Sequence, residues 1–182
     1  KYADSIILSM KNILPILLII AFMLAYSIAM ADENQYDRQL FLKYGVGFGS
    51  SAKERAVEVK TASIGKQRQF FIFIDQWEVG GWFEQSNDPS RKSSGFIDYS
   101  VGLNVDAGYL YVQSLWGVAA ITTKDSYLGG NFQFNQDFSL GVKDARGVAI
   151  GLNYKHMSSA GIFTPNVGRD FISIRLGVPL GP

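Results

Sequence analysis

Polar and apolar residues alternate along several segments of the chain. In Gly130–Val142, phenylalanine, leucine and valine gather at even-numbered positions, whereas asparagine, glutamine, aspartate and serine occupy the odd-numbered ones. Ser94–Asp106 repeats the pattern, with isoleucine, tyrosine, valine and leucine on one parity and mostly polar residues on the other. A period of two is typical of a β-strand that has one apolar face and one polar face. These segments therefore predict strands.

The length and number of such segments distinguish a membrane barrel from a soluble sandwich. The candidate strands are Leu40–Gly49, Glu54–Ile64, Gln69–Gln85, Ser94–Asp106, Tyr109–Ile121, Tyr127–Val142, Arg146–Ser158 and Asp170–Leu180. Most have ten or more residues, whereas soluble strands average about five or six and a tilted membrane strand needs about 9 to 11. An even number of long strands closes without unpaired edges in lipid. We predict an all-β fold, an eight-stranded antiparallel transmembrane β-barrel whose interior is filled by side chains.

Two features qualify this pattern. In Gln69–Gln85 apolar residues occupy both parities, which we interpret as a β-bulge near Gly80 and Gly81. The tryptophans, Trp77, Trp82 and Trp116, suit the aromatic girdles of a membrane barrel, although ordinary packing would explain them equally well.

The first 31 residues are interpreted as residues upstream of a start at Met10 followed by a cleavable signal peptide. Lys11 supplies a basic start, Ile13–Ala29 is apolar, and Ala29–Ala31 has the small-residue pattern of a cleavage site. An uncleaved anchor helix is the alternative, but the polar residues that follow fit a mature N-terminus better. Residues 32–182 would then form one exported barrel domain.

Composition excludes several classes of function. The 17 basic and 16 acidic residues nearly cancel, so the sequence does not favour a nucleic-acid partner. There is no cysteine, which excludes a disulfide scaffold and a thiolate metal site. A single histidine argues against a histidine-rich metal centre, and we expect neither a metal nor a cofactor.

That histidine, His156, has an unusual place in the alternation. In Arg146–Ser158 it shares a parity with Val148, Ile150 and Leu152, so in a barrel it would face lipid, where an unpaired imidazole is costly. Ser158 lies two residues further on the same face. On the following strand, Asp170 has the parity of the apolar positions too. An acid, an imidazole and a hydroxyl therefore converge on one outward-facing spot, as nucleophilic acyl transfer requires.

Topology predicts the height of this spot. With both ends of an even-stranded barrel in the periplasm, the connection Ser159–Arg169 is extracellular. The three residues would then lie at the outer leaflet of a bacterial outer membrane.

The segment His156–Gly161, of sequence His-Met-Ser-Ser-Ala-Gly, and the Pro-Asn-Val-Gly at 165–168 resemble the signature of the lipid A 3-O-deacylase (PagL) family. The resemblance implies an outer-membrane barrel that hydrolyses the 3-linked acyl ester of lipid A, within lipopolysaccharide, without a metal. It also implies that Ser158 is the nucleophile, His156 the general base and Asp170 the orienting acid.

The sequence departs from the family pattern at two positions. Ser159 stands where the family usually has asparagine after the nucleophile, and Asp170 replaces the usual, longer glutamate. We take Asn166 and the backbone N–H groups of Ser159 and Gly161 as candidates for stabilising the oxyanion.

Two other functions remain open from the sequence. A small barrel without enzymatic activity could act as an adhesin or a structural protein, although the short loops count against it. A lipid A acyltransferase would share the chemistry of the site but must exclude water. The sequence also leaves the oligomeric state open, a homodimer included.

Overall fold

The computed structural model describes residues 37–49, 59–84, 92–124 and 127–180. The chain divides into two compact units, Lys1–Gln35 and Tyr36–Pro182, and the described residues all belong to the second. The predicted signal peptide lies outside the described residues. No helix in the described ranges is long and apolar enough to cross a membrane.

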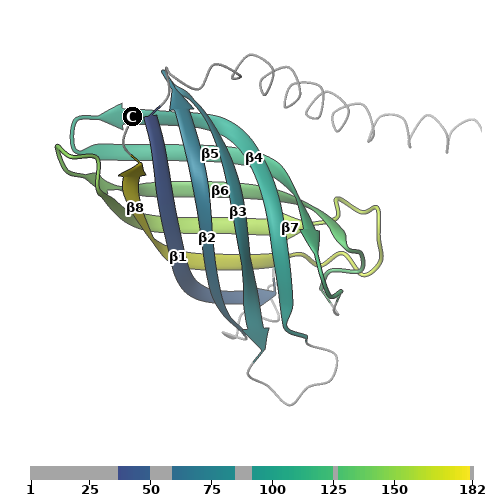
Figure 1. Ribbon diagram of the computed structural model, residues 1–182. Coiled ribbons are helices and arrows are strands. Elements are labelled where there is room, and N and C mark those ends of the chain that lie inside the picture. The colour runs from purple at the N-terminus through teal and green to yellow at the C-terminus, as the bar shows by residue number, and fades with distance from the viewer. Residues whose placement is uncertain (1–36, 50–58, 85–91, 125–126, 181–182) are drawn as a thin grey trace, which may run out of the picture. The chain divides into compact units, whose positions relative to one another are not determined.

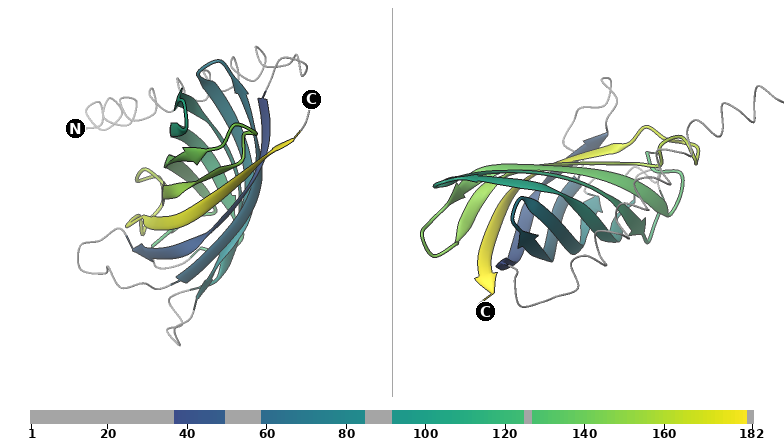
Figure 2. Two further views of the ribbon diagram at one scale, coloured as in Figure 1. Left: turned by 90° about the vertical axis from the view of Figure 1, so that its left-hand side faces the viewer. Right: turned by 90° about the horizontal axis from the view of Figure 1, so that it is seen from above.

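The second unit is a closed barrel of eight antiparallel strands, each hydrogen-bonded to its neighbours in sequence (Figure 1). The strands are β1 (Asp37–Gly49), β2 (Val59–Phe70), β3 (Phe73–Glu84), β4 (Ser94–Ala107), β5 (Leu110–Ile121), β6 (Phe132–Lys143), β7 (Ala149–Ser158) and β8 (Arg169–Leu180). Pairing of β1 with β8 closes the barrel, and Figure 2 shows these two strands side by side. The predicted fold class is confirmed.

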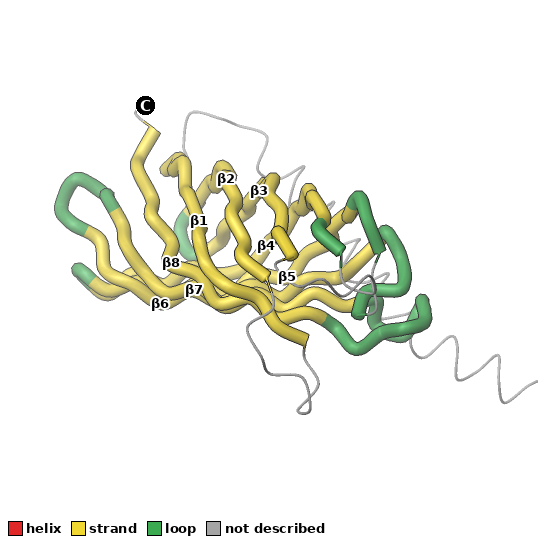
Figure 3. Tube along the Cα trace, turned by 90° about the horizontal axis from the view of Figure 1, so that it is seen from below, coloured by secondary structure: helices red, strands yellow, loops and turns green. Residues whose placement is uncertain are grey.

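The two ends of the barrel differ in their connections (Figure 3). At the end where β1 begins and β8 ends, which we call the terminal end, connections contain two, two and five residues. At the opposite end, the loop end, they contain nine or ten. Short turns on the side of the termini and longer loops on the other are typical of outer-membrane barrels.

Apolar side chains cover the outside of the barrel. Val148, Ile150, Leu152, Ile172 and Ile174 are between 41% and 63% exposed, as expected for a face that contacts lipid. Trp77 and Trp116 also point outward, whereas Trp82 is fully buried in the interior, which agrees with ordinary packing rather than with an aromatic girdle. Trp82 stacks there with Phe96 and packs at a tilt against Phe171, and these residues together with Met157 fill the loop end.

Charged side chains fill the middle of the interior. Lys43 Nζ donates to Glu78 Oε2 at 2.9 Å and to Asp137 Oδ2 at 2.6 Å. Lys155 Nζ donates to the same Glu78 oxygen at 2.7 Å and to Asp98 Oδ2 at 2.5 Å. All five residues, which we call the interior network, are at most 4% exposed. They join β1, β3, β4, β6 and β7 across the barrel and fix the relative register of those strands.

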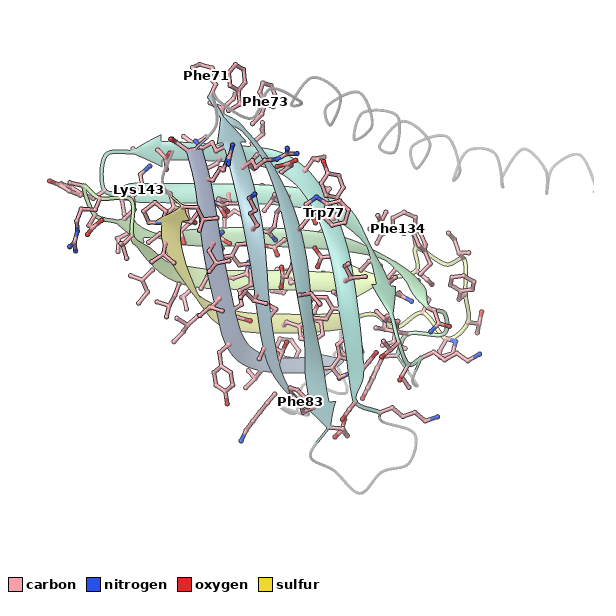
Figure 4. All side chains as sticks on the ribbon, in the orientation of Figure 1. Phe71, Phe73, Trp77, Phe83, Phe134 and Lys143 are labelled. Atoms are coloured by element: carbon pink, nitrogen blue, oxygen red, sulfur yellow. The ribbon has the colours of Figure 1, made fainter. Side chains whose placement is uncertain are left out.

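Several predicted strand boundaries were wrong. Gln69–Gln85 is not one bulged strand, because the chain reverses at Phe71 and Ile72, and the pairing of β2 with β3 is continuous past Gly80 and Gly81. This hairpin turn explains the mixed parity. Figure 4 shows Phe71 and Phe73 projecting from it, and Phe71 has a positive φ of 58°.

The other differences lie at strand ends. β2 continues to Phe70, well beyond the predicted end at Ile64, whereas the predicted residues 54–58 lie outside the described residues. β6 begins only at Phe132, because Leu128 instead forms an isolated bridge with Asn166. β7 begins at Ala149 after the turn that Asp144 organises by accepting hydrogen bonds from the backbone N–H groups of Arg146 and Val148.

Candidate active site

His156 and Asp170 meet on the outer face of the barrel, close to its loop end. They are direct cross-strand partners, His156 near the end of β7 and Asp170 near the start of β8. His156 Nδ1 lies 2.7 Å from Asp170 Oδ1. Their side chains are 27% and 13% exposed, so the pair is half-buried. The alternation that puts apolar residues outside therefore puts this pair outside too.

A third side chain, which the sequence reasoning missed, also contacts the acid. The Tyr154 hydroxyl donates to Asp170 Oδ1 at 2.9 Å, so the phenol and the imidazole share one carboxylate oxygen. Tyr154 is two residues before His156 on the same face of β7. The shared parity was visible in the sequence, but the diagonal contact with Asp170 depends on the register between β7 and β8. This second hydrogen bond restrains a carboxylate whose side chain is one methylene shorter than glutamate.

Ser158, the last residue of β7, lies on the same outward face as His156 and is half-buried. Two residues along a strand separate Cα atoms by about 7 Å, which is within reach of a serine and a histidine side chain that lean toward each other. Ser158 is paired across the sheet with Phe134 of β6. The expected residues Ser158, His156 and Asp170 are thus placed on one face, at the end of two adjacent strands.

The loop that follows Ser158 is held in a defined conformation. The Ser159 backbone N–H and hydroxyl donate to Asn166 Oδ1 at 2.7 and 2.8 Å, and the N–H of Ile162 donates to the Ser159 carbonyl oxygen at 3.0 Å. Ala160 and Gly161 have φ values of 51° and 83°, which reverse the chain immediately after Ser159. The Ser159 N–H is therefore occupied by Asn166 in this structure.

A neighbouring segment anchors the far side of this loop. The N–H of Gly129 donates to the Pro165 carbonyl oxygen at 2.8 Å, and the N–H of Val167 donates to the Tyr127 carbonyl oxygen at 3.1 Å. Beneath the loop, the buried Arg169 guanidinium lies 4.8 Å from the centre of the Tyr127 ring and 5.4 Å from that of Trp82. The apolar interior and these backbone bonds thus support the loop on which Asn166 and Gly161 lie.

The acidic residues in the interior do not form a metal site of the usual kind. Within the described ranges, no group of three or more histidine or acidic side chains is arranged to hold a metal ion. Instead, Glu78, Asp98 and Asp137 surround the ammonium groups of Lys43 and Lys155.

Comparisons with known proteins agree with this architecture. The profile of the lipid A 3-O-deacylase (PagL) family matches residues 66–179, whereas no curated protein sequence matches. A crystal structure of the outer membrane enzyme PagL is similar, with 17% sequence identity and a TM-score of 0.57 over 78% of this chain and 99% of that one. Neisserial surface protein A is similar in fold at 12% identity, with a TM-score of 0.52 over 81% of this chain and 98% of that one.

The family match covers more than half of the chain and includes β7, the following loop and almost all of β8, where His156, Ser158 and Asp170 lie. The barrel is that of a bacterial outer-membrane protein, so the loop end faces the cell exterior and the terminal end faces the periplasm. This chain belongs to the lipid A 3-O-deacylase (PagL) family.

Proposed function

We propose that this protein hydrolyses the 3-O-linked acyl ester of lipid A in the outer leaflet, using Ser158 as nucleophile, His156 as general base and Asp170 as orienting acid. The observation that carries the proposal is the hydrogen-bonded pair of His156 and Asp170, 2.7 Å apart, on the lipid-facing side of the barrel near its extracellular end. In that position the pair faces the leaflet that lipopolysaccharide forms. The choice of the 3-O-linked ester as the bond that is cleaved follows from membership of the lipid A 3-O-deacylase family.

Asp170 would accept a hydrogen bond from the Nδ1–H of His156, which leaves Nε2 as the basic nitrogen toward Ser158. As Ser158 Oγ attacks the ester carbonyl carbon, Nε2 takes the hydroxyl proton, and Asp170 stabilises the imidazolium that forms. The tetrahedral intermediate then collapses. Its C–O bond to the sugar breaks, and the sugar oxygen leaves with the proton from His156.

The second half of the reaction releases the fatty acid. Water attacks the acyl group on Ser158 while His156 removes its proton, and the ester bond to Ser158 breaks as that proton returns to Oγ.

The oxyanion would be stabilised by donors from the loop after β7. Gly161 N–H and the Asn166 side-chain amide are the favoured candidates, because the Asn166 oxygen is already occupied by Ser159. Ser159 N–H could join them only by leaving Asn166. Tyr154 acts through Asp170 and is a positioning residue.

The test uses purified protein in detergent with purified lipid A and a chelator, followed by mass spectrometry of the lipid. We expect the loss of one hydroxyacyl chain together with the appearance of the free hydroxy fatty acid. Transfer of that chain to another lipid would indicate an acyltransferase. Unchanged lipid A would contradict the proposal and favour a barrel without enzymatic activity, and activity abolished by the chelator would indicate a metal-dependent lipase.

A further inference from the structure

A second feature of the outer wall lies away from β7 and β8. A hollow of about 670 Å³ is formed by β1 to β4 near the extracellular end of the barrel. Its floor is a cross-strand row of small, outward-facing residues, Ala62, Gly81 and Gly95. Large apolar side chains border it, namely Leu42, Ile64, Val79 and Phe83, of which Phe83 is labelled in Figure 4 at the end of β3.

The hollow exists because its floor residues are alanine and glycine, whereas the surrounding wall carries large side chains. If a Cβ atom were added at Gly95, its nearest neighbour would be a methyl carbon of Thr122, 3.5 Å away. A void on a membrane-facing wall forfeits dispersion contacts unless a flexible chain fills it. Hydrocarbon is the material available there, so the hollow is suited to an acyl chain that runs along the barrel.

Three lysines lie at the extracellular side of the hollow. Lys60 is exposed and shares the outward parity of Ala62, two residues nearer the loop end of β2. Lys92 and Lys124 are also exposed. Lys92 directly precedes the lining residue Ser93, and Lys124 follows the lining residue Thr122 by two positions. The Thr122 N–H donates to the Gly95 carbonyl oxygen at 2.9 Å.

Among the residues that the structure describes, the acid at this end of β3 has inward parity. Glu84, at the end of β3, has the opposite parity to outward-facing Phe83, and its Oε2 atom is buried. Lys60, Lys92 and Lys124 thus place positive charge at the water side of an apolar hollow, from three separate segments. A lipid with a phosphorylated headgroup complements both features.

We infer that this wall is a second lipid A site, in which one acyl chain occupies the hollow and a phosphate of the diglucosamine headgroup contacts Lys60, Lys92 and Lys124. It is separate from the hydrolytic residues, which are on β7 and β8. The identity of the lipid rests on the proposed function, since the extracellular leaflet supplies lipid A as the phosphorylated lipid. Its occupancy does not require hydrolysis.

The experiment counts lipid A molecules bound to the Ser158→Ala protein by native mass spectrometry from detergent micelles. The triple variant Lys60→Gln/Lys92→Gln/Lys124→Gln should lose one bound lipid A, with about a fivefold weakening for each lysine at low salt. Lys66→Gln is the matched control, because Lys66 is exposed on the same face of β2 but six residues nearer the periplasmic end. Dephosphorylated lipid A should bind the triple variant and the control equally.

A second pair of variants tests the hollow itself. Ala62→Phe should also lose one bound lipid A, whereas Ser114→Phe, a comparable enlargement on the outward face of β5 eight residues from the lining residue Thr122, should not. Electrophoretic mobility of unheated samples reports whether each variant has folded, and the Ala62→Phe arm remains informative if the triple variant does not fold.

Three results would overturn the inference: equal lipid A counts in the variants and their controls, retention of phosphatidylglycerol as strongly as lipid A at this wall, or a change of oligomeric state in Ala62→Phe with the lipid count unchanged. Failure of the proposed function is a separate result. Absence of hydrolysis by the unmutated protein, with loss of one bound lipid A in both hollow variants, would leave the wall site standing alone.

Discussion

Lys155 and His156 are neighbours in the sequence, yet they belong to two regions that treat polar groups in opposite ways. Lys155 points into the barrel, where its ammonium group contacts Glu78 and Asp98 and is 3% exposed. His156 points outward, and its side chain remains 27% exposed beside Asp170. In the interior the charged groups form ion pairs with one another, whereas the outer site keeps its polar groups within reach of a lipid. Burial thus distinguishes the interior network from the proposed catalytic pair.

The largest effect should follow removal of the imidazole. His156→Ala should lower deacylation of lipid A about 10⁴-fold or more, because no other group would accept the Ser158 proton. The free energy of unfolding should change little, since the side chain is half-buried and outward. Mass spectrometry of lipid A measures the first quantity and urea unfolding in detergent the second. A large fall in the free energy of unfolding of this variant would mean that His156 contributes to stability as the interior residues do, and would contradict the comparison.

Replacement of an interior lysine should instead lower the stability of the barrel. Lys155→Met keeps most of the side-chain volume but leaves buried Asp98 without its counter-ion and leaves Glu78 with Lys43 alone, and should lower the free energy of unfolding by about 3–5 kcal/mol. Urea unfolding followed by tryptophan fluorescence measures this change. Lys66→Met, an exposed lysine on β2, is the control and should be nearly neutral. Equal stability of the two variants would refute a structural role for the interior network.

Loss of the orienting acid should be milder than loss of the base. Asp170→Ala should reduce activity about 10²-fold, because the imidazole remains but is no longer held in one tautomer. Asp170→Glu retains a carboxylate and adds the methylene that the family usually has, so it should recover most of the lost rate. If Asp170→Ala had the full rate, Asp170 would not belong to the site.

The smallest effect is expected at Tyr154. Tyr154→Phe removes one hydrogen bond to Asp170, worth about 1 kcal/mol, and should lower kcat about fivefold with KM unchanged. In an Asp170→Ala background the same substitution should have no further effect, because the tyrosine acts through the acid. Tyr44→Phe, at an exposed tyrosine on β1, controls for loss of an outward hydroxyl. Additive losses in the double variant would give Tyr154 a role independent of Asp170.

The alternation of residues predicted much of the architecture because the period of two is local. It gave the barrel class, the outward faces of β7 and β8, and the common face of His156, Ser158 and Asp170. The turn at Phe71 and Ile72 was missed because it contains none of the glycine, proline or asparagine residues that usually signal a hairpin.

Features that depend on register could not be predicted in this way. The interior network takes Lys43, Glu78 and Lys155 from three strands that are distant in the sequence, so no local pattern reveals it. The contact of Tyr154 with Asp170 and the use of the Ser159 N–H by Asn166 likewise depend on how β7, β8 and their loop fit together. The burial of Trp82, which decides between a girdle position and ordinary packing, could not be predicted because apolar residues occupy both parities in Gln69–Gln85.

The most direct test of the central claim is lipid A deacylation by the Ser158→Ala variant, measured beside the unmutated protein in detergent with a chelator present. The unmutated protein should remove one hydroxyacyl chain, whereas Ser158→Ala should leave the mass of lipid A unchanged although it folds with the same heat-stable mobility. Deacylation at the same rate by both proteins would contradict the assignment of Ser158 as the nucleophile and, with it, the proposed mechanism.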